Sequence, residues 1–219
     1  MRNQEKDELE MAARRKLMLE TGFRIFAENG IETVPMQDVA NACGLGIATL
    51  YRYYNTKLSF VIAIGLTKWE EYFDEVEAAY VRHDGEKMTA AEELDFYLSM
   101  YMKLYREHRD LLRFNQNFND YILHEHATDE QLSEYRKAVG PFSQKFHLLY
   151  EKGRRDGTIR TDEPEQIVFN ATMHIMLAVC GRFAQGVLYG GSEDMTQELL
   201  ILKQMMLNEY SVASSPVLS

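Results

Sequence analysis

The sequence is poor in residues that interrupt regular structure and in residues that form disulfides. Its 219 residues include 4 Pro and 13 Gly, too few for the many turns of a β-sandwich or for a disordered Pro- and Gly-rich chain. The 2 cysteines, Cys43 and Cys180, have no metal-ligand spacing and no disulfide framework around them, which is typical of a reducing compartment. These absences predict an all-α protein of the cytoplasm.

A surplus of positive charge is also absent. The chain has 24 Lys and Arg against 34 Asp and Glu, a net charge of −10, which argues against a basic protein that coats nucleic acid. Residues 1–60 contain eight charged residues of each sign, so the whole negative surplus lies in residues 61–219. An acidic body would repel phosphate and confine any nucleic acid to the neutral N-terminal part.

Signals for export, membrane insertion and catalysis are lacking as well. Residues 1–10 are polar, and no apolar run approaches the length of a bilayer span. His124 and His126 are two positions apart and so point to different helix faces, while His174 stands alone among apolar residues. The sequence shows no nucleophile triad, metal-ligand pattern or phosphate-binding glycine loop. We therefore expect no enzyme, no cofactor and no metal, and we interpret His174 as a core residue.

Apolar residues recur at three- and four-residue intervals, the period of amphipathic helices. Helices are expected over residues 14–29, 35–43, 47–54, 57–81, 89–109, 111–126, 129–155, 164–188 and 192–210. The Gly140-Pro141 pair should kink or split the helix over 129–155, because proline cannot donate a helical hydrogen bond. Residues 1–12 are expected to form a flexible arm and residues 211–219 a frayed tail.

A helix-turn-helix spacing begins at Met36. Counting from this residue, the motif needs a small residue at the fifth place, where the helices cross, and Gly at the ninth, in the turn. It also needs an apolar residue at the fifteenth place, on the buried face of the second helix. Ala40, Gly44 and Leu50 occupy these places. The spacing alone leaves a plain helical hairpin as an equal alternative.

Four runs around this motif are more specific than the spacing. They are Phe26-Ala27-Glu28-Asn29-Gly30, Gln37-Asp38-Val39-Ala40, Cys43-Gly44-Leu45, and Thr49-Leu50-Tyr51-Arg52-Tyr53-Tyr54 followed by Lys57. Together they resemble the DNA-binding head of the tetracycline-repressor (TetR) family over about the first quarter of the chain. The resemblance implies an N-terminal three-helix helix-turn-helix domain over residues 13–58. It also implies a larger C-terminal helical domain for effector binding and dimerisation over residues 59–210.

Two features depart from the usual family pattern. The serine that commonly caps the recognition helix is Gly46, which still permits a helix start but removes a hydroxyl that could reach phosphate. The threonine pair that commonly opens the preceding helix is Val34-Pro35. Phosphate contact at that helix would then depend on the backbone amides near Met36 and Gln37.

With Leu50 buried, the opposite face of the helix over residues 47–54 is free to enter a major groove. By resemblance, the base-reading residues are Ile47, Ala48 and Arg52. The first two can offer apolar contact to a thymine methyl, whereas Arg52 can fork onto guanine. The predicted phosphate contacts are Met36, Gln37, Thr49, Tyr51, Tyr53 and Lys57. Tyr54 is interpreted as a core aromatic, and Arg14-Arg15-Lys16 fits a solvated helix start as well as a phosphate clamp.

The C-terminal part is rich in large apolar and aromatic side chains, most of which must form core. Because Tyr97, Tyr101 and Tyr105 follow one another at four-residue intervals, they lie on one helix face and could line a cavity. The family places an effector site in this part of the chain. The predicted pocket residues are Trp69, Phe73, Tyr97, Tyr101, Tyr105, Phe118, Tyr121, Phe146, Met173 and Met176.

The last two expected helices are apolar on more than one face and so need more than one partner. In the resembled family this pair forms a four-helix dimer interface, with a core confined to one chain as the alternative. The predicted interface residues are Ile175, Ala178, Val179, Phe183, Leu199, Leu202 and Met206.

The resemblance implies a homodimeric, sequence-specific DNA-binding transcriptional regulator. The favoured form is a repressor that a small-molecule effector releases from a palindromic operator. One alternative is a regulator of the same fold that has no effector or that activates transcription. A more distant alternative is an all-helical enzyme or carrier that keeps the N-terminal head only for packing.

Overall fold

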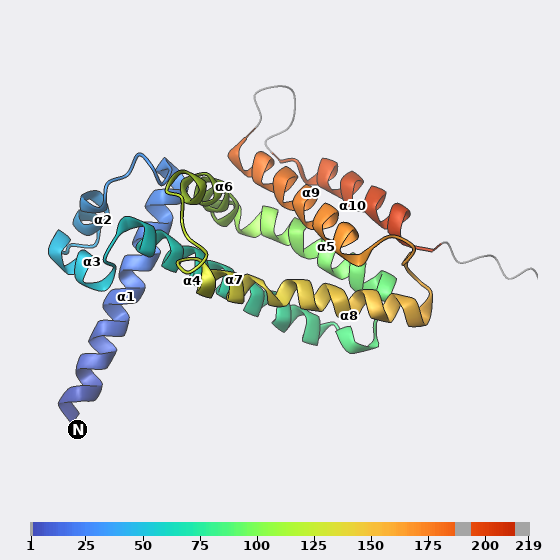
Figure 1. Ribbon diagram of the computed structural model, residues 1–219, viewed down its shortest axis with the longest axis horizontal. Coiled ribbons are helices and arrows are strands. Elements are labelled where there is room, and N and C mark those ends of the chain that lie inside the picture. The colour runs from blue at the N-terminus through green and yellow to red at the C-terminus, as the bar shows by residue number, and fades with distance from the viewer. Residues whose placement is uncertain (1, 187–193, 213–219) are drawn as a thin grey trace, which may run out of the picture. The chain divides into compact units, whose positions relative to one another are not determined.

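The computed structural model describes residues 2–186 and 194–212, and within these ranges it contains no strand beyond one isolated bridge between Ile159 and Ser211. The α-helices are α1 (Arg2–Asn29), α2 (Met36–Ala42), α3 (Ile47–Tyr53), α4 (Lys57–Arg82), α5 (Ala90–Glu107), α6 (Arg109–His124), α7 (Ser133–Val139), α8 (Pro141–Asp156), α9 (Glu165–Gln185) and α10 (Thr196–Tyr210) (Figure 1). The predicted all-α class is confirmed.

Most helix boundaries follow local signals in the sequence. Gly30 and Gly157 have positive φ values of 83° and 67° directly after α1 and α8, the conformation that glycine adopts without a Cβ penalty. The predicted break at Gly140-Pro141 is confirmed, since α7 ends at Val139 and α8 begins at Pro141. The expected helix end at 188, the expected start at 192 and residues 213–219 of the expected tail lie outside the described residues. The expected fraying is wrong at the start of the tail, because Ser211 forms a bridge with Ile159 and the Val212 amide donates to the Thr158 carbonyl at 2.9 Å.

The N-terminal arm predicted over residues 1–12 is helical from Arg2 onward. All side chains from Lys6 to Leu17 are exposed, so this stretch contributes nothing to the buried core of the described residues. Its residues are strong helix formers without a glycine or proline. Lys6 and Arg14 each lie one turn from Glu10, at 4.0 and 3.8 Å. The polar side chains of this stretch therefore stay outside the core, but they do not prevent helix formation.

The chain divides into two compact units. The first contains Met1–Glu71 and Arg113–Val139, and the second contains Tyr72–Leu112 and Gly140–Ser219. Both α4 and α6 contribute residues to each unit, so the units do not follow the boundary expected at residue 58. The assignment of effector binding and dimerisation to residues 59–210 stays a prediction.

The core of the first unit forms where α1 meets the start of α4. Phe60 is fully buried, and its ring lies 6.0 Å from the ring of Phe26 and 4.8 Å from that of Tyr54. Gly22 permits this close approach, because a Cβ built there would lie 2.5 Å from Phe60 and 2.9 Å from Ile64. The contact holds the helix-turn-helix against the first turns of α4.

The second unit is built around α5, which packs against α8, α9 and α10 (Figure 1). A capping box starts α5, with the Thr89 hydroxyl accepting from the Glu92 amide and the Glu92 carboxylate accepting from the Thr89 amide. Leu98, Leu104 and Tyr105 are almost fully buried along this helix. α5 is therefore the central helix of its unit.

Helix α9 is a long apolar segment, contrary to the expectation that no apolar run approaches the length of a bilayer span. Glu165–Gln185 is long and apolar enough to cross a membrane, although a core helix of a soluble protein passes the same test. Its composition has two sources, since Val168, Phe169 and Met176 are buried while Ile167 and Ile175 are exposed. Apolar residues therefore lie on both faces of α9, and the outward face has no cover within the described chain. His174 is exposed on this helix, so its interpretation as a core residue is wrong.

Candidate functional sites

The turn between α2 and α3 has the geometry that the spacing predicts. Ala40 and Leu50 are fully buried, one at the helix crossing and one on the inner face of α3. Gly44 has a φ of 67°, a conformation that strains other residues. The Leu45 amide donates to the Ala40 carbonyl at 2.9 Å. The prediction of a helix-turn-helix over these residues is confirmed, and the plain helical hairpin is excluded.

The outward face of α3 carries the residues predicted to touch DNA. Ala48, Tyr51 and Arg52 are exposed, while Ile47, Thr49 and Tyr53 are half-buried; these six are the predicted base and phosphate contacts of this helix. The Arg52 guanidinium lies 6.0 Å from the Tyr53 ring centroid. No hydrogen bond or ion pair to another described residue restrains the Arg52 side chain, which leaves its donors available to a base edge.

Helix α2 offers its backbone and one side chain. Met36 is buried, so only its amide could reach a phosphate. Gln37 is exposed, and its side-chain amide donates to the Asn41 side chain at 2.8 Å. Pro35 precedes the helix without a side-chain cap, which leaves the first amides of α2 without a side-chain partner.

Lys57 is turned inward at the start of α4. Its ammonium donates to the Glu32 carbonyl at 3.3 Å and lies 5.5 Å from the Tyr121 ring centroid. Burial lowers the Lys57 pKa, while Glu125 and Glu32 oppose the change. A phosphate contact through this ammonium would require Lys57 to leave both partners.

Tyr54 is a core residue, as its pattern indicates. It is buried against Phe60 with their ring centroids 4.8 Å apart. Burial raises the pKa of its hydroxyl, and nearby Arg15 offsets part of that rise. Arg15 therefore lies near the base of the helix-turn-helix rather than only at a solvated helix start.

An aromatic cavity lies within the second unit. It is enclosed by α5, α8 and α9 and is lined by Leu94, Tyr97, Leu98, Tyr101, Phe142, Lys145, Phe146, Leu149, Phe169, Thr172 and Met173. Its volume is about 20 Å³, room for about one water molecule. Any larger ligand would have to displace a side chain.

Four predicted pocket residues line this cavity, namely Tyr97, Tyr101, Phe146 and Met173. Three others belong to the first unit: Trp69, Phe118 and Tyr121. Phe118 packs on Tyr135 there, with ring centroids 4.8 Å apart.

The remaining three predicted pocket residues lie in the second unit without lining the cavity. Phe73 stacks on Phe142 with ring centroids 5.9 Å apart, behind the lining. Tyr105 is buried, and its hydroxyl accepts from the Met195 amide at 3.0 Å. Met176 is fully buried.

Sequence reasoning missed two cavity residues that matter for its chemistry, Phe142 and Lys145. Phe142, Phe146 and Leu149 repeat at helical spacing, which could have identified the inner face of α8. Nothing in the pattern marks Lys145, because its neighbours in the sequence are an ordinary mixture of polar and apolar residues.

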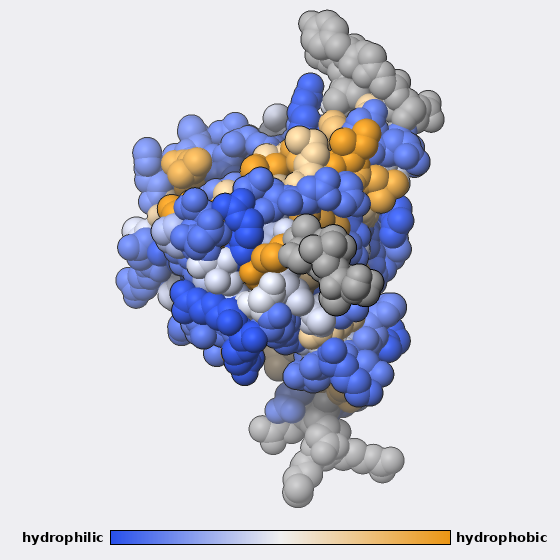
Figure 2. Space-filling model, turned by 90° about the vertical axis from the view of Figure 1, so that its right-hand side faces the viewer, coloured by the Kyte–Doolittle hydropathy of each residue, from blue (hydrophilic) through white to orange (hydrophobic). Residues whose placement is uncertain are grey.

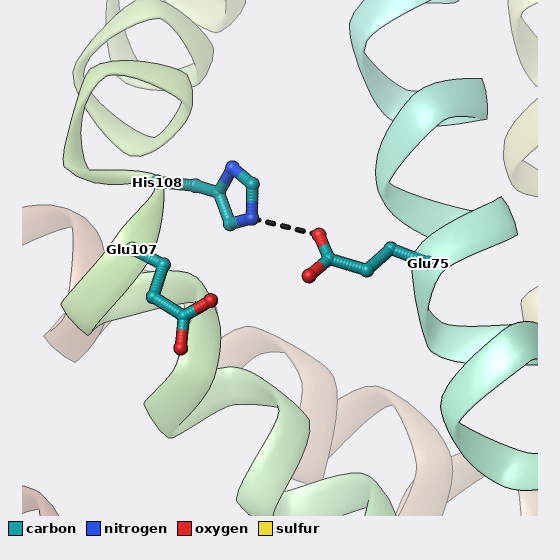
Figure 3. Close-up of side chains that lie close together, drawn as sticks. All are labelled: Glu75, Glu107 and His108. Atoms are coloured by element: carbon teal, nitrogen blue, oxygen red, sulfur yellow. Dashed lines mark hydrogen bonds and ion pairs between the residues drawn. The ribbon is translucent and has the colours of Figure 1, made fainter. Parts of the chain in front are cut away.

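Within residues 2–186 and 194–212, two side-chain clusters could hold a metal ion by geometry alone, and one contains Glu75, Glu107 and His108. Figure 3 shows these side chains facing one another, with His108 Nε2 at 2.9 Å from a Glu75 oxygen. The Lys103 ammonium pairs with Glu75 at 2.7 Å and also with Glu107. These pairs lower the Glu75 pKa and raise the Lys103 pKa. A cationic side chain thus already pairs with both carboxylates of the cluster.

The second cluster contains His147, Glu151 and Glu165 at the surface of α8 and α9. His147 Nδ1 lies 3.0 Å from Glu165, and Arg154 pairs with Glu151 at 2.7 Å. Cys180 is buried elsewhere in the unit, and burial raises its thiol pKa to about 12, which makes it a poor ligand at neutral pH.

Helices α9 and α10 expose apolar side chains to solvent. The exposed members are Ile167, Ile175, Leu200, Ile201 and Met205, with Ile201 and Met205 each 62% exposed. Figure 2 shows hydrophobic surface gathered in the upper part of the view, the side on which α9 and α10 lie. We call these five residues the outward apolar face.

The predicted dimer residues divide between the two sides of this helix pair. Ile175 and Ala178 are exposed, and Val179, Phe183 and Leu202 are half-buried; this set retains surface for a partner. Leu199 and Met206 are 0% and 7% exposed, so they serve the core of a single chain. Leu200, Ile201 and Met205 of α10 are exposed apolar residues outside the predicted set.

Comparisons with known proteins agree with this geometry. The profile of a family described as bacterial regulatory proteins, tetR family, matches residues 18–64, the segment containing the helix-turn-helix. No curated protein matches the chain.

Several solved structures share the fold over most of their length. The ketosteroid transcriptional regulator KstR2 of Mycobacterium tuberculosis is 17% identical with a TM-score of 0.65, covering 91% of this chain and 95% of that chain. A tetR-family regulatory protein from Rhodococcus RHA1 is 18% identical with a TM-score of 0.68, covering 91% and 98%. FadR from Bacillus subtilis, solved with stearoyl-CoA, is 16% identical with a TM-score of 0.67, covering 88% and 95%.

Proposed function

We propose that the chain is a cytoplasmic transcriptional repressor that a small molecule releases from DNA, because its residues 18–64 match the model of the tetR family of bacterial regulatory proteins. The single observation that carries this proposal is the outward face of α3, where exposed Ala48, Tyr51 and Arg52 stand opposite fully buried Leu50. A short helix held by its inner face and free on its outer face is the form that enters a major groove.

Within α3, different side chains have different tasks. Arg52 has the fork of donors that pairs with guanine, and Ile47 and Ala48 offer apolar contact to a thymine methyl. Thr49, Tyr51 and Tyr53, together with the first amides of α2, bind phosphates and set the register. Lys57 joins them only if its ammonium leaves Glu32 and Tyr121.

A second copy of the chain would cover the outward apolar face. Apolar residues on this face cost free energy in water, at roughly 25 cal/mol for each Å² left exposed. An isologous contact between two α9–α10 pairs buries them and relates two α3 helices by a two-fold axis. Such a dimer reads a palindrome whose half-sites are separated by about one turn of DNA, roughly 34–36 Å.

Release from DNA would depend on the cavity and on α4. The first residues of α4 belong to the unit with the helix-turn-helix, and its residues from Tyr72 belong to the unit with the cavity. A ligand switches the protein only if it binds better to the conformation with low DNA affinity. The relative FadR was solved with stearoyl-CoA, which supports a ligand-binding role for the second unit.

Selection of duplexes from random DNA by the full-length protein tests this function. The expected product is a palindrome enriched at low ionic strength, with affinity that falls as salt rises. A selected motif without two-fold symmetry would contradict the proposed dimer. No enrichment of any duplex would remove the DNA-binding function and favour a helical carrier or enzyme.

A further inference from the structure

Phe142 is one of the side chains that line the cavity in the second unit, and it lies among other aromatic rings. Phe142 stands edge-on to Tyr97 and Tyr101, with interplanar angles of 81° and 88° and centroid distances of 6.0 and 6.2 Å. Its ring also lies 6.1 Å from Phe169. Such edge-to-face pairs contribute beyond the area they bury. A planar ring that replaced Phe142 would find the same partners in place.

Phe142 is also in a position where exchange is feasible. It is the second residue of α8, directly after the Gly140-Pro141 break, and its side chain is only partly buried. The first turn of a helix lacks the full set of helical hydrogen bonds. Phe142 can therefore move with less disruption than Phe146, which lies one turn farther into α8 and is buried.

The charge at the cavity selects the sign of a ligand. Among the described residues, Lys145 is the one charged residue in the lining. Its ammonium pairs with Glu77 of α4 and lies 5.9 Å from the Tyr80 ring centroid. Aromatic rings alone would suit a quaternary ammonium group, but the Lys145 charge repels a cation and attracts an anion.

Glu93, a buried acid that acts on Tyr97, already has a cationic partner and does not reverse this preference. Glu93 is 4% exposed and pairs with Lys152. Burial and the Glu93 carboxylate both raise the pKa of Tyr97, so the Tyr97 hydroxyl stays neutral and can donate to a ligand. The cavity thus presents a neutral donor and a cation.

We propose that the cavity binds an aromatic carboxylate, whose ring replaces Phe142 and whose carboxylate pairs with Lys145 in place of Glu77. The inference rests on the proposed function, for which it names the chemical class of the effector. Its consequence for regulation is direct, because Glu77 belongs to α4 and loses its partner when the ligand binds. The ligand would then favour a different position of α4, the condition for release from DNA.

Three probes with the same ring and different charge test this proposal on the full-length protein without DNA. They are 2-naphthoate, neutral 2-naphthamide and the cationic 2-naphthyltrimethylammonium, each titrated by calorimetry. We expect 2-naphthoate to bind at least about tenfold more tightly than the amide, and the cation to bind most weakly. A tighter cation, equal affinities, or no binding of any probe would overturn the proposal.

Variants assign the preference to particular side chains. Lys145→Met should abolish the carboxylate preference while leaving amide binding within about threefold of the wild type, and Lys145→Arg should keep most of the preference. The control Lys137→Met, at a Lys that is 72% exposed and pairs with Glu134, should change nothing. A preference that survives Lys145→Met would exclude the proposed pairing.

Phe142→Ala tests the ring exchange. Because the variant has no ring to displace, it should bind 2-naphthoate more tightly than the wild type does. Equal or weaker binding by a variant with an unchanged far-ultraviolet circular dichroism spectrum would exclude the exchange. DNA affinity measured without any probe separates this proposal from the proposed function. Intact DNA binding without a carboxylate preference refutes only the inference, and the reverse result refutes only the function.

Discussion

Replacing Gly22 with alanine should weaken the packing that supports the helix-turn-helix. The new Cβ would lie 2.5 and 2.7 Å from two Phe60 ring atoms and 2.9 Å from Ile64. Phe60 is fully buried between Phe26 and Tyr54, so its ring has no free direction in which to move. Overpacking of this kind costs about 1–3 kcal/mol, whereas alanine inside a helix gains about 1 kcal/mol over glycine. The packing cost minus the propensity gain is about 0–2 kcal/mol. Because the Phe60 ring cannot move aside, we expect a net destabilisation of about 1–2 kcal/mol, in the upper half of this range.

Urea denaturation followed by circular dichroism measures this change in the free energy of unfolding. Gly65→Ala is the matched control, because its Cβ would lie 3.1 Å from Phe118 and 3.3 Å from Tyr135, contacts that a small shift relieves. The control should stay within about 1 kcal/mol of the wild type, since the propensity gain offsets the tighter packing. The reasoning fails if Gly22→Ala is as stable as the wild type or if Gly65→Ala is the less stable variant.

Three further predictions concern DNA, assembly and pH. Arg52→Ala should relax base preference at one position at a cost of about 1–3 kcal/mol, whereas Tyr51→Ala should weaken binding to all duplexes alike; a selected motif unchanged by Arg52→Ala would contradict the assignment. Ile201→Glu, on the outward apolar face, should shift sedimentation toward the monomer and weaken binding to a palindrome, and an unchanged dimer would exclude this interface. The lowered pKa of Glu75, due first to its bond with Lys103, contributes stability above the unfolded-state pKa that is lost as pH falls through the folded-state value. Lys103→Met should therefore flatten the fall in thermal stability between about pH 5 and pH 3, and a profile parallel to that of the wild type would count against the pair.

The sequence predicted the helix-turn-helix because this motif depends on short-range geometry. Gly44 is required by its positive φ, and the places of Ala40 and Leu50 follow from the helix crossing. These constraints act over a few residues, so they require particular residue types at fixed positions in the sequence.

The helical conformation of the first residues of α1 was harder to predict from the sequence. Its polar composition predicted an arm, but a helix needs no buried face where its residues have high helix propensity and paired charges. The pairs of Lys6 and Arg14 with Glu10 are visible in the structure and were available in the sequence spacing.

Faces of uniformly apolar helices could not be assigned from the sequence. In α10, Leu199, Leu200 and Ile201 are consecutive apolar residues, and only packing against α5 decides that Leu199 is buried while the other two are exposed. Periodicity identifies a buried face only where polar residues mark the opposite face. The interface on α9 and α10 therefore stays a prediction, and two of its residues, Leu199 and Met206, are buried within the single chain instead.

The sequence predicted one wall of the cavity and not the other, because only one wall depends on spacing within a single helix. The four-residue spacing of Tyr97 and Tyr101 identified one wall on α5. The opposite wall depends on how α8 and α9 pack on α5, which is a long-range property. Trp69 and Phe118 were assigned to the pocket because large aromatics suit one, yet they belong to the core of the other unit.

Methylation interference on a selected duplex tests the central claim most directly, because dimethyl sulfate modifies guanine N7 in the major groove and adenine N3 in the minor groove. If the exposed face of α3 reads bases, methylation of guanine N7 within each half-site should prevent binding by the full-length protein. The account predicts two such clusters about one helical turn apart. Interference confined to adenine N3, or none at any guanine, would contradict it.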